Sequence, residues 1–277
     1  MSDALRKLIE LAITEDLDGG EDITSNSTIP LEQLSTADFV TRSPGVIAGI
    51  SVAVAVLNYL EITDVTALVR DGDSVAAGTT ILTARGNTRK LLLAERTTLN
   101  FLTHLSGIAT LTRSWVHAIE GTQCQIRDTR KTTPGWRKLE KDAVLAGGGT
   151  NHRLSLSDAA LVKDNHIVAA GGTLKAFESV RAQFPGKEIE VEVDTLEQLH
   201  EVLPGNPDLI LLDNMSREMC AQAVAIVAGR VKLEASGGIS IENAMDYART
   251  GVNYLAIGAL THSAKVLDIG LDLKMGK

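Results

Sequence analysis

Residues 189–214 read IEVEVDTLEQLHEVLPGNPDLILLDN, and this stretch decides the fold. A short apolar run at 189–193 is followed by a helical segment and then by a second apolar run at 209–212. Similar runs occur at 124–128, 160–163, 231–235 and 254–257. Strands that alternate with helices in this way predict a parallel sheet covered by helices.

The turn after the first of these strands has no Gly-x-Gly-x-x-Gly sequence, which argues against a dinucleotide-binding Rossmann half. A TIM-like barrel fits the six βα units better, although six units fall short of the usual eight. We therefore expect an α/β fold with an open TIM-like barrel in the C-terminal part of the chain.

The N-terminal part has a different pattern. A first helix precedes short β-type runs at 37–42, 46–50, 65–70 and 79–84, which indicate a small α+β region. Residues 69–78 resemble the hairpins of biotinyl or lipoyl carrier modules, but the turn lacks the lysine that carries the cofactor. A structural hairpin is the favoured interpretation.

The pattern from 89 to 120 is helical, and we expect two helices that are broken near Ser106-Gly107. Arg96 falls on an apolar face of this segment, where it is either salt-bridged or offered to a second subunit. Spacing alone favours the first alternative. The alternating residues 266–273 predict an extra strand that returns to the N-terminal region, so the expected domains are 1–107, 108–265 and the C-terminal segment 266–277.

Composition excludes several classes of protein. The chain has 277 residues, of which 44% are hydrophobic, and no apolar run approaches the roughly 18 residues of a membrane span, so we expect a cytoplasmic protein that does not contact a membrane. A net charge of −8 and 3% aromatic residues argue against a nucleic-acid partner. Cys124 and Cys220 lack the spacing of a disulfide framework or a zinc site and are expected in the core.

Positive charge is concentrated in residues 127–163, which hold eight Lys or Arg against four acidic residues. Cations at strand ends or after glycines suit a ligand with several negative groups, and these are Arg130, Lys131, Arg153 and Lys163. Three others have helical spacing and are expected on a solvated surface: Arg137, Lys138 and Lys141.

The ends of the six expected strands carry the other candidate site residues, because barrel sites form on the βα loops. Glycines in Ser236-Gly237-Gly238 and Gly258-Ala259 would let backbone N–H groups approach a phosphate. His152 could be a core residue or one that supports a ligand-binding residue, and beside Arg153 it is better suited to helping to bind an anion than to binding a metal. Glu192 and Asp213 can serve as acid and base, hold Mg²⁺ with ribose hydroxyls, stabilise a developing cation, or form a structural salt bridge.

Several motifs together resemble one family, quinolinate phosphoribosyltransferase. They occur in the expected order over nearly the whole chain and comprise the stretches 128–132, 147–153, 163–166, 212–215, 234–239 and 258–262. Glu95-Arg96-Thr97 also matches the family position whose arginine enters the partner's site. The resemblance therefore reverses the weighting given to Arg96 by spacing alone.

The resemblance implies an enzyme that joins quinolinate to phosphoribosyl pyrophosphate with Mg²⁺, releases pyrophosphate and CO₂, and forms nicotinate mononucleotide for NAD synthesis. It implies an open barrel with an N-terminal sandwich, paired into homodimers, with hexamers as a further assembly. It also assigns roles. The residues for the quinolinate carboxylates and pyrophosphate are Thr129, Arg130, Lys131, His152, Arg153, Lys163 and the Arg96 that crosses from the second subunit.

For phosphoribosyl pyrophosphate, the resemblance assigns binding of the ribose and the metal to Glu192 and Asp213, with Mg²⁺ held mainly through substrate. The 5′-phosphate is assigned to the two glycine turns, formed by Ser236, Gly237, Gly238, Ile257, Gly258 and Ala259. Catalytic roles fall on Glu192, Asp213 and Lys131, the last by stabilising or protonating a ring carbanion.

Three alternatives stand beside this reading. A related branch associated with molybdenum transport shares the fold, but it would be expected to alter the dicarboxylate-binding cations, which are intact here. A Schiff-base lyase would use Lys163 and have no need of Mg²⁺. A carrier module based on residues 69–78 is disfavoured by the missing lysine.

Overall fold

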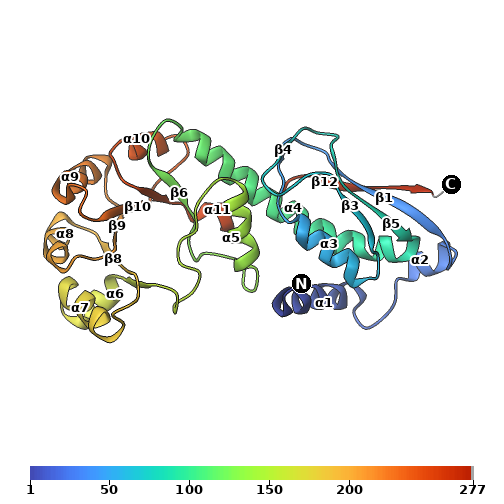
Figure 1. The fold of residues 1–277 in the computed structure, drawn as a ribbon, viewed down its shortest axis with the longest axis horizontal. Helices are drawn as coiled ribbons and strands as arrows, with labels where there is room; N and C mark the ends of the chain where they lie inside the picture. Colours follow the sequence, from blue (N-terminus) through green and yellow to red (C-terminus); the bar gives the residue numbers. More distant parts are fainter. Residues whose placement is uncertain (276–277) are drawn as a thin grey trace. The chain divides into compact units, whose positions relative to one another are not determined.

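The computed structural model describes residues 1–275, which form two compact units (Figure 1). The first unit comprises Met1–Leu111, Pro134–Gly148 and the segment from Ser263 onward, and the second comprises Thr112–Thr133 and Gly149–His262. These limits differ from the expected boundaries at 107 and 265, chiefly because 134–148 belong to the first unit. Within residues 1–275, every helix is too short or too polar to cross a membrane.

The first unit contains an antiparallel sheet with the strand order β12-β1-β5-β3. Its strands are β1 (Leu34–Thr41), β3 (Asp64–Ala67), β5 (Thr80–Asn87) and β12 (Ile269–Met275). Strand β12 pairs with β1 from Thr41↔Ile269 to Ser35↔Met275, so the last described strand lies beside the first. Strands β3 and β5 pair antiparallel, and residues 69–78 lie in the segment that joins them, so this segment is part of a structural hairpin. Within it, β4 (Ser74–Val75) pairs with β2 (Gly45–Val46).

The helices of the first unit are α1 (Asp3–Leu17), α2 (Ile23–Thr28), α3 (Ile50–Tyr59), α5 (Arg137–Ala146) and the N-terminal part of α4 (Thr88–Ala118). Two of these helices, α3 and α4, complete the apolar core of this sheet. The expected strand at 46–50 is short, because β2 ends at Val46 and α3 begins at Ile50. The buried positions Val52, Val56 and Leu57 of α3 follow helical spacing and pack inward.

The expected break near Ser106-Gly107 is wrong, since α4 is one helix of 31 residues. A glycine at position 107 is required for close packing: a Cβ atom added there would lie 2.2 Å from the backbone oxygen of Lys265. Ser106 is also used in packing, because its hydroxyl accepts a hydrogen bond from the N–H of Ala48 at 3.0 Å. The small residues therefore allow close packing against two other segments and do not end the helix.

The second unit contains six parallel strands, all at positions expected from the sequence. They are β6 (Gln125–Arg127), β7 (Ala160–Val162), β8 (Ile189–Val193), β9 (Leu209–Asp213), β10 (Lys232–Ser236) and β11 (Tyr254–Ala256). Their order is β6-β11-β10-β9-β8-β7, so β6 and β7 form the two ends of the sheet. A single bridge from Arg127 to Thr150 extends the β6 end. This is the open α/β barrel that the sequence predicted.

Helices cover the outside of this curved sheet, and in Figure 1 α7, α8, α9 and α10 lie along the outer side of β8, β9 and β10. Their bounds are α6 (Asp164–Ala170), α7 (Thr173–Gln183), α8 (Leu196–Val202), α9 (Arg217–Val227), α10 (Ala244–Ala248) and α11 (Ala259–His262), with a 3₁₀ turn η1 at Leu203–Gly205.

Alternate residues of the barrel strands differ in polarity. In β8, Val191 and Val193 are fully buried, while Glu190 and Glu192 point to the other face. In β10, Ala235 is likewise buried between Glu234 and Ser236. The apolar residues serve the packing of the covering helices, so the polar set is left for the interior of the barrel and its mouth.

Candidate active site

A pocket of about 670 Å³ lies at the carboxyl ends of the barrel strands, entirely within the second unit. Its lining includes every candidate that the sequence placed at a strand end: Thr129, Arg130, Lys131, His152, Arg153, Lys163, Glu192, Asp213, Ser236, Gly237, Gly238, Ile257, Gly258 and Ala259. The parallel arrangement explains this convergence, because all six strands end at the same edge.

The remaining candidate, Arg96, lies on α4 in the first unit, where its side chain is exposed. Arg96 is not part of the pocket lining within one chain. Its expected role in the site of a second subunit therefore stays a prediction.

The pocket contains two arginines with unsatisfied donors. The Nε atoms of Arg130 and Arg153 are buried and have no hydrogen-bond partner within residues 1–275. Burial, and then the positive charge of Arg130, lower the pKa of the Arg153 guanidinium. Two like charges with buried free donors are costly without an anion between them, so this part of the pocket is prepared for carboxylate or phosphate oxygens.

Lys131 is held in place through its backbone. Its N–H donates to the Thr129 hydroxyl at 3.0 Å, and its carbonyl oxygen accepts a hydrogen bond from the Thr261 hydroxyl at 2.6 Å. A Cβ atom added at Gly258 would lie 3.1 Å from Cδ of Lys131, so glycine leaves room for this side chain. The lysine itself is exposed and its ammonium group can reach a ligand in the pocket.

The two predicted carboxylates are both at the pocket but differ in their partners. Glu192 is 9% exposed, and its Oε2 atom is 3.0 Å from Nζ of Lys163. Asp213 accepts a hydrogen bond from the side-chain amide of Asn214 at 2.7 Å. Burial, and then the negative charge of Asp194, raise the pKa of Asp213 above its usual range.

The turn after β10 can be formed only by glycine at its centre. Gly237 has a φ of +87°, and a Cβ atom there would lie 2.1 Å from Oδ1 of Asn214. The N–H of Asn214 donates to the carbonyl oxygen of Ser236 at 2.8 Å, which joins the ends of β9 and β10. The glycine turn is therefore fixed in shape and exposes backbone to the pocket.

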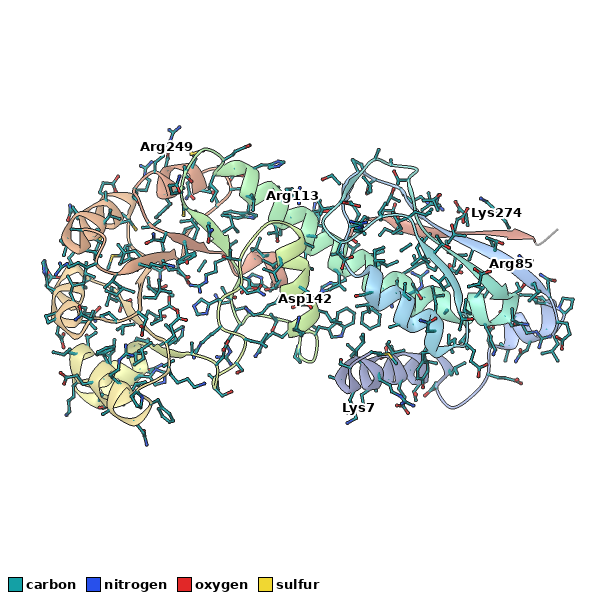
Figure 2. The ribbon with its side chains drawn as sticks, in the orientation of Figure 1. Lys7, Arg85, Arg113, Asp142, Arg249 and Lys274 are labelled. Carbon is teal, nitrogen blue, oxygen red and sulfur yellow. The ribbon has the colours of Figure 1, made fainter. Side chains whose placement is uncertain are left out.

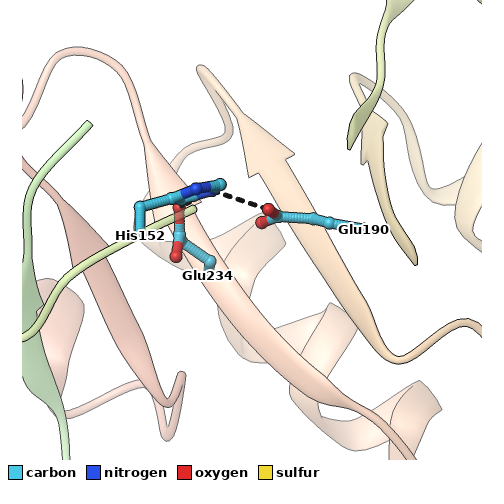
Figure 3. Close-up of side chains that lie close together, drawn as sticks. All are labelled: His152, Glu190 and Glu234. Carbon is cyan, nitrogen blue, oxygen red and sulfur yellow. Dashed lines mark ion pairs between the residues drawn. The ribbon is translucent and has the colours of Figure 1, made fainter. Parts of the chain in front are cut away.

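His152 and Glu234 line the pocket and belong to a buried charged cluster that also contains Arg127 and Glu190. We call these four residues the floor cluster, and Figure 3 shows His152, Glu190 and Glu234. The sequence reasoning named only His152 of the four as a candidate site residue. Nε2 of His152 lies 2.7 Å from Glu190 Oε2 and 3.6 Å from Glu234 Oε1, while Arg127 pairs with Glu234 at 2.8 Å. The histidine nitrogen and the two carboxylates lie within 4.8 Å of one another, a spacing that could also hold a metal ion.

Burial dominates the protonation of the floor cluster. It raises the pKa of Glu190 to about 7, although the charges of Arg127 and Arg153 oppose the shift. Burial and the charge of Glu190 likewise raise the pKa of Glu234 to about 7. The sequence held a signal for both residues, since each lies two positions before a pocket residue, Glu192 or Ser236, on the same face of its strand.

The structure corrects one further prediction from the sequence. Lys141 was expected on a solvated surface together with Arg137 and Lys138, but it is fully buried. Helix α5 also buries Glu140, Ala143 and Val144. Its inward face therefore carries two charged residues, which a rule based on charge and helical spacing assigns to solvent.

Family models match both parts of the chain. A model described as the C-terminal domain of quinolinate phosphoribosyl transferase matches residues 108–272, and the corresponding N-terminal domain model matches residues 22–106.

Full-length relatives agree with these matches. The chain is 52% identical over 277 residues to the nicotinate-nucleotide pyrophosphorylase (carboxylating) of Mycobacterium leprae, covering 98% of each chain. It is 42% identical to the probable nicotinate-nucleotide pyrophosphorylase (carboxylating) of Bacillus subtilis, covering 98% of this chain and 94% of the relative. The crystal structure of NadC from Streptococcus pyogenes has a TM-score of 0.94 and 38% identity, over 99% of this chain and 97% of that chain.

Proposed function

The chain belongs to the quinolinate phosphoribosyltransferase family, and from that premise we propose how its pocket performs the reaction. The enzyme transfers the phosphoribosyl group of phosphoribosyl pyrophosphate to the ring nitrogen of quinolinate. Pyrophosphate leaves from the ribose, and the carboxylate next to the nitrogen leaves as CO₂. The product is nicotinate mononucleotide, an intermediate in NAD synthesis.

The observation that carries this assignment is the pair of buried Nε donors of Arg130 and Arg153, which have no partner among the residues that the structure describes. Quinolinate is a dianion with two adjacent carboxylates, so it supplies acceptors for two neighbouring guanidinium groups. A planar guanidinium binds a carboxylate through two parallel hydrogen bonds, which also orients the pyridine ring. Nicotinate has one carboxylate and would leave one of these buried donors unsatisfied.

The other substrate is expected over the ends of β9, β10 and β11. The glycine turn at Gly237 and the backbone around Gly258 offer space for the 5′-phosphate, and the ammonium groups of Lys131 and Lys163 suit the pyrophosphate. As pyrophosphate departs, positive charge develops on the ribose. The carboxylates of Glu192 and Asp213 would stabilise that charge.

The same two carboxylates fit a magnesium ion. Mg²⁺ prefers oxygen ligands and is usually bound by one or two carboxylates together with substrate phosphates, and Glu192 and Asp213 both line the pocket. When bound, the ion would neutralise charge on the departing pyrophosphate.

Decarboxylation follows from the charge that the new bond places on the ring nitrogen. The carbon that loses CO₂ is left with an electron pair that the adjacent cationic nitrogen stabilises, and a proton must then be added to that carbon. We assign the donation of this proton to Lys131, because its backbone N–H and carbonyl group are both held by hydrogen bonds and its ammonium group carries a proton.

We further propose that the working unit is a homodimer in which Arg96 of one chain completes the site of the other, with a hexamer as a further assembly. Two observations support this proposal: Arg96 is exposed on α4, and it lies in the part of the chain that matches the family's N-terminal domain model. The cytoplasm is the proposed location, since both cysteines are free, as expected in a reducing compartment.

The direct test is product formation. Purified protein should form nicotinate mononucleotide from quinolinate and phosphoribosyl pyrophosphate only when Mg²⁺ is present. The product is separated and measured by chromatography. Arg153→Ala should lower kcat/KM by about 100-fold or more, because it removes a buried guanidinium from the dianion. Arg249→Ala is the matched control, since Arg249 projects from the surface beside α10 (Figure 2) and should keep full activity. Equal turnover of nicotinate would contradict the assignment.

The role of Arg96 can be tested by mixing. Arg96→Ala and Lys131→Ala are each expected to be inactive, and mixed dimers should recover activity because one of the two sites then contains both residues. Recovery of up to about a quarter of wild-type activity is expected for random exchange. If no activity returns although subunit exchange is demonstrated, Arg96 does not act in a neighbouring site.

A further inference from the structure

Both ring nitrogens of His152 are already engaged. The N–H of Arg153 donates to Nδ1 at 2.7 Å, so Nδ1 presents a lone pair. The ring proton is therefore on Nε2, which lies 2.7 Å from Oε2 of Glu190. Figure 3 shows the ring edge directed at this carboxylate. A histidine held in this way has no ring N–H to spare for a substrate.

The hydrogen bond to Nδ1 fixes one end of Arg153. The other end is fixed by its Nη1 atom, which donates to the carbonyl oxygen of Ala159 at 2.9 Å. Between these two attachments lies the buried Nε, for which the described part of the chain offers no partner. The direction of this donor consequently depends on the orientation of the His152 ring.

Glu190 is in turn fixed by its place in the barrel. It is 3% exposed, and its strand β8 lies between β7 and β9 in the sheet. The neighbouring Glu234 closes the other side of the ring nitrogen at 3.6 Å and is itself held by Arg127 at 2.8 Å. Three residues of the floor cluster lie on β6, β8 and β10, and the guanidinium of Arg127 lies 4.5 Å from the centre of the Tyr254 ring on β11, so the cluster is anchored on four strands.

We propose that Glu190 is a positioning residue for quinolinate: it fixes the tautomer and orientation of His152, and His152 in turn aims Arg153 at a carboxylate of the substrate. This rests on the proposed function, because it takes quinolinate as the ligand of Arg153. It also reassigns His152 from an anion ligand to a residue that acts through Arg153. Binding of phosphoribosyl pyrophosphate should be independent of Glu190.

The sign of the effect separates positioning from simple electrostatics. A negative charge near a dianion weakens its binding, so a Glu190 that acted only through its charge would give tighter quinolinate binding when removed. Positioning predicts the opposite. Glu190→Leu should raise the KM for quinolinate on the order of 10- to 100-fold, because a small misplacement of a binding group has effects of this size. The KM for phosphoribosyl pyrophosphate should not change.

Glu190→Gln is the conservative variant, because its side-chain oxygen still accepts the Nε2–H bond while the charge is lost. It should keep the KM for quinolinate near the wild-type value. Glu178→Leu is the matched control, since Glu178 is an exposed carboxylate on α7 of the same unit and its loss should have no effect. Tighter quinolinate binding in Glu190→Leu, or equal increases in both KM values, would overturn the proposal.

A double-variant cycle tests whether Glu190 acts through Arg153. Arg153→Lys keeps a cation, so quinolinate binding stays measurable by calorimetry, but it lacks the Nε that must be aimed. Adding Glu190→Leu to Arg153→Lys should change the Kd for quinolinate by less than about threefold. A change as large as that of Glu190→Leu alone would show that Glu190 acts by another route.

A measurement without substrate distinguishes failure of this proposal from failure of the proposed function. In ¹⁵N NMR spectra of the free protein, assigned with His152→Gln, the ring should be neutral with the proton on Nε2, and this tautomer should be lost in Glu190→Leu. A proton on Nδ1 would overturn the proposal even if the enzyme turns over quinolinate. Metal analysis adds a further outcome: a stoichiometric ion lost in Glu190→Leu would replace the hydrogen bond by coordination and also overturn it.

Discussion

The interiors of the two units are built from different side chains. In the first unit the sheet buries Phe39, Leu82 and Ala84 against Leu91 and Leu102 of α4, and all five are fully buried. In the second unit the space inside the barrel strands holds the floor cluster, with its two carboxylates, arginine and histidine. An apolar interior contributes free energy of folding, whereas buried charges must be compensated one by one. The apolar core of the first unit is therefore expected to contribute more to the stability of its unit than the charged space inside the barrel strands contributes to the second unit.

The largest expected effect is on stability in the first unit. Phe39→Ala removes a fully buried ring from the apolar core and should lower the free energy of unfolding by about 3 to 5 kcal/mol. The cost arises from lost burial and from the cavity that remains. Phe184→Ala is the control, because this ring is 53% exposed and should change stability by under about 0.5 kcal/mol. Urea unfolding measures both, and equal losses would mean that the first core is not the stabilising one.

The barrel interior should respond differently to single and double changes. Arg127→Met leaves Glu234 buried without its partner and should lower the free energy of unfolding by about 3 kcal/mol. Arg127→Met combined with Glu234→Leu should recover most of that loss, because an apolar pair needs no compensation. Activity should stay low in the double variant. A double variant that is less stable than the single one would show that the charged pair itself stabilises the barrel.

The pH dependence of stability should also differ between the units. The pKa of Glu234 is raised to about 7 in the folded state, from an ordinary value of 4.5, so its contribution is complete below pH 4.5 and is lost as the pH rises through 7. The expected slope is about 1.4 kcal/mol per pH unit at most, for one proton. Urea unfolding of wild type and Glu234→Gln between pH 5 and 7 measures the contribution of Glu234 together with its coupling to Glu190, and parallel curves would contradict it.

Asp38 in the first unit should contribute a dependence of stability on pH that has the opposite sign. Burial raises its pKa, but hydrogen bonds from Lys274 and Thr83 outweigh this, and the net pKa lies below the ordinary 3.8. Its contribution is therefore present above pH 3.8 and is lost only as the pH falls through the folded value. Between pH 5 and 7 Asp38 adds no slope, so it does not mask that of Glu234.

The smallest expected effect is at the surface of the first unit. Lys138 pairs with Asp142 one turn later on α5, and both side chains are well exposed. Lys138→Ala should lower the free energy of unfolding by under about 0.5 kcal/mol, and the difference should shrink further in 1 M salt because solvent screens exposed pairs. A loss comparable to that of Arg127→Met would remove the distinction between exposed and buried pairs.

The sequence predicted the barrel well because its strands are short apolar runs bounded by turns, a local pattern. The break at Gly107 was predicted wrongly for the complementary reason. What glycine provides there is room for the backbone of Lys265, more than 150 residues away, and a local pattern contains nothing about that contact. The same holds for Lys141, whose burial depends on what packs against α5.

The site was predictable to the extent that strand ends define it. Glu192, Asp213 and Arg153 line the pocket because parallel strands end together. The floor cluster was missed, since pairing Glu190 with His152 requires the register of β8 and the path of the loop that carries the histidine. Strand alternation could have placed Glu190 and Glu234 on the inner face, but not at 2.7 Å or 3.6 Å from one nitrogen.

The pairing of β1 with β12 has a consequence for the growing chain. On the ribosome, β1 and β5 emerge early, but one edge of β1 stays without its partner until Ile269–Met275 has been synthesised. At ordinary translation rates that delay is on the order of tens of seconds. An unpaired strand edge can pair with strand edges of other chains during that time. We therefore expect the nascent N-terminal unit to depend on a chaperone. Premature release before Ile269 should then give aggregates rather than a shortened enzyme.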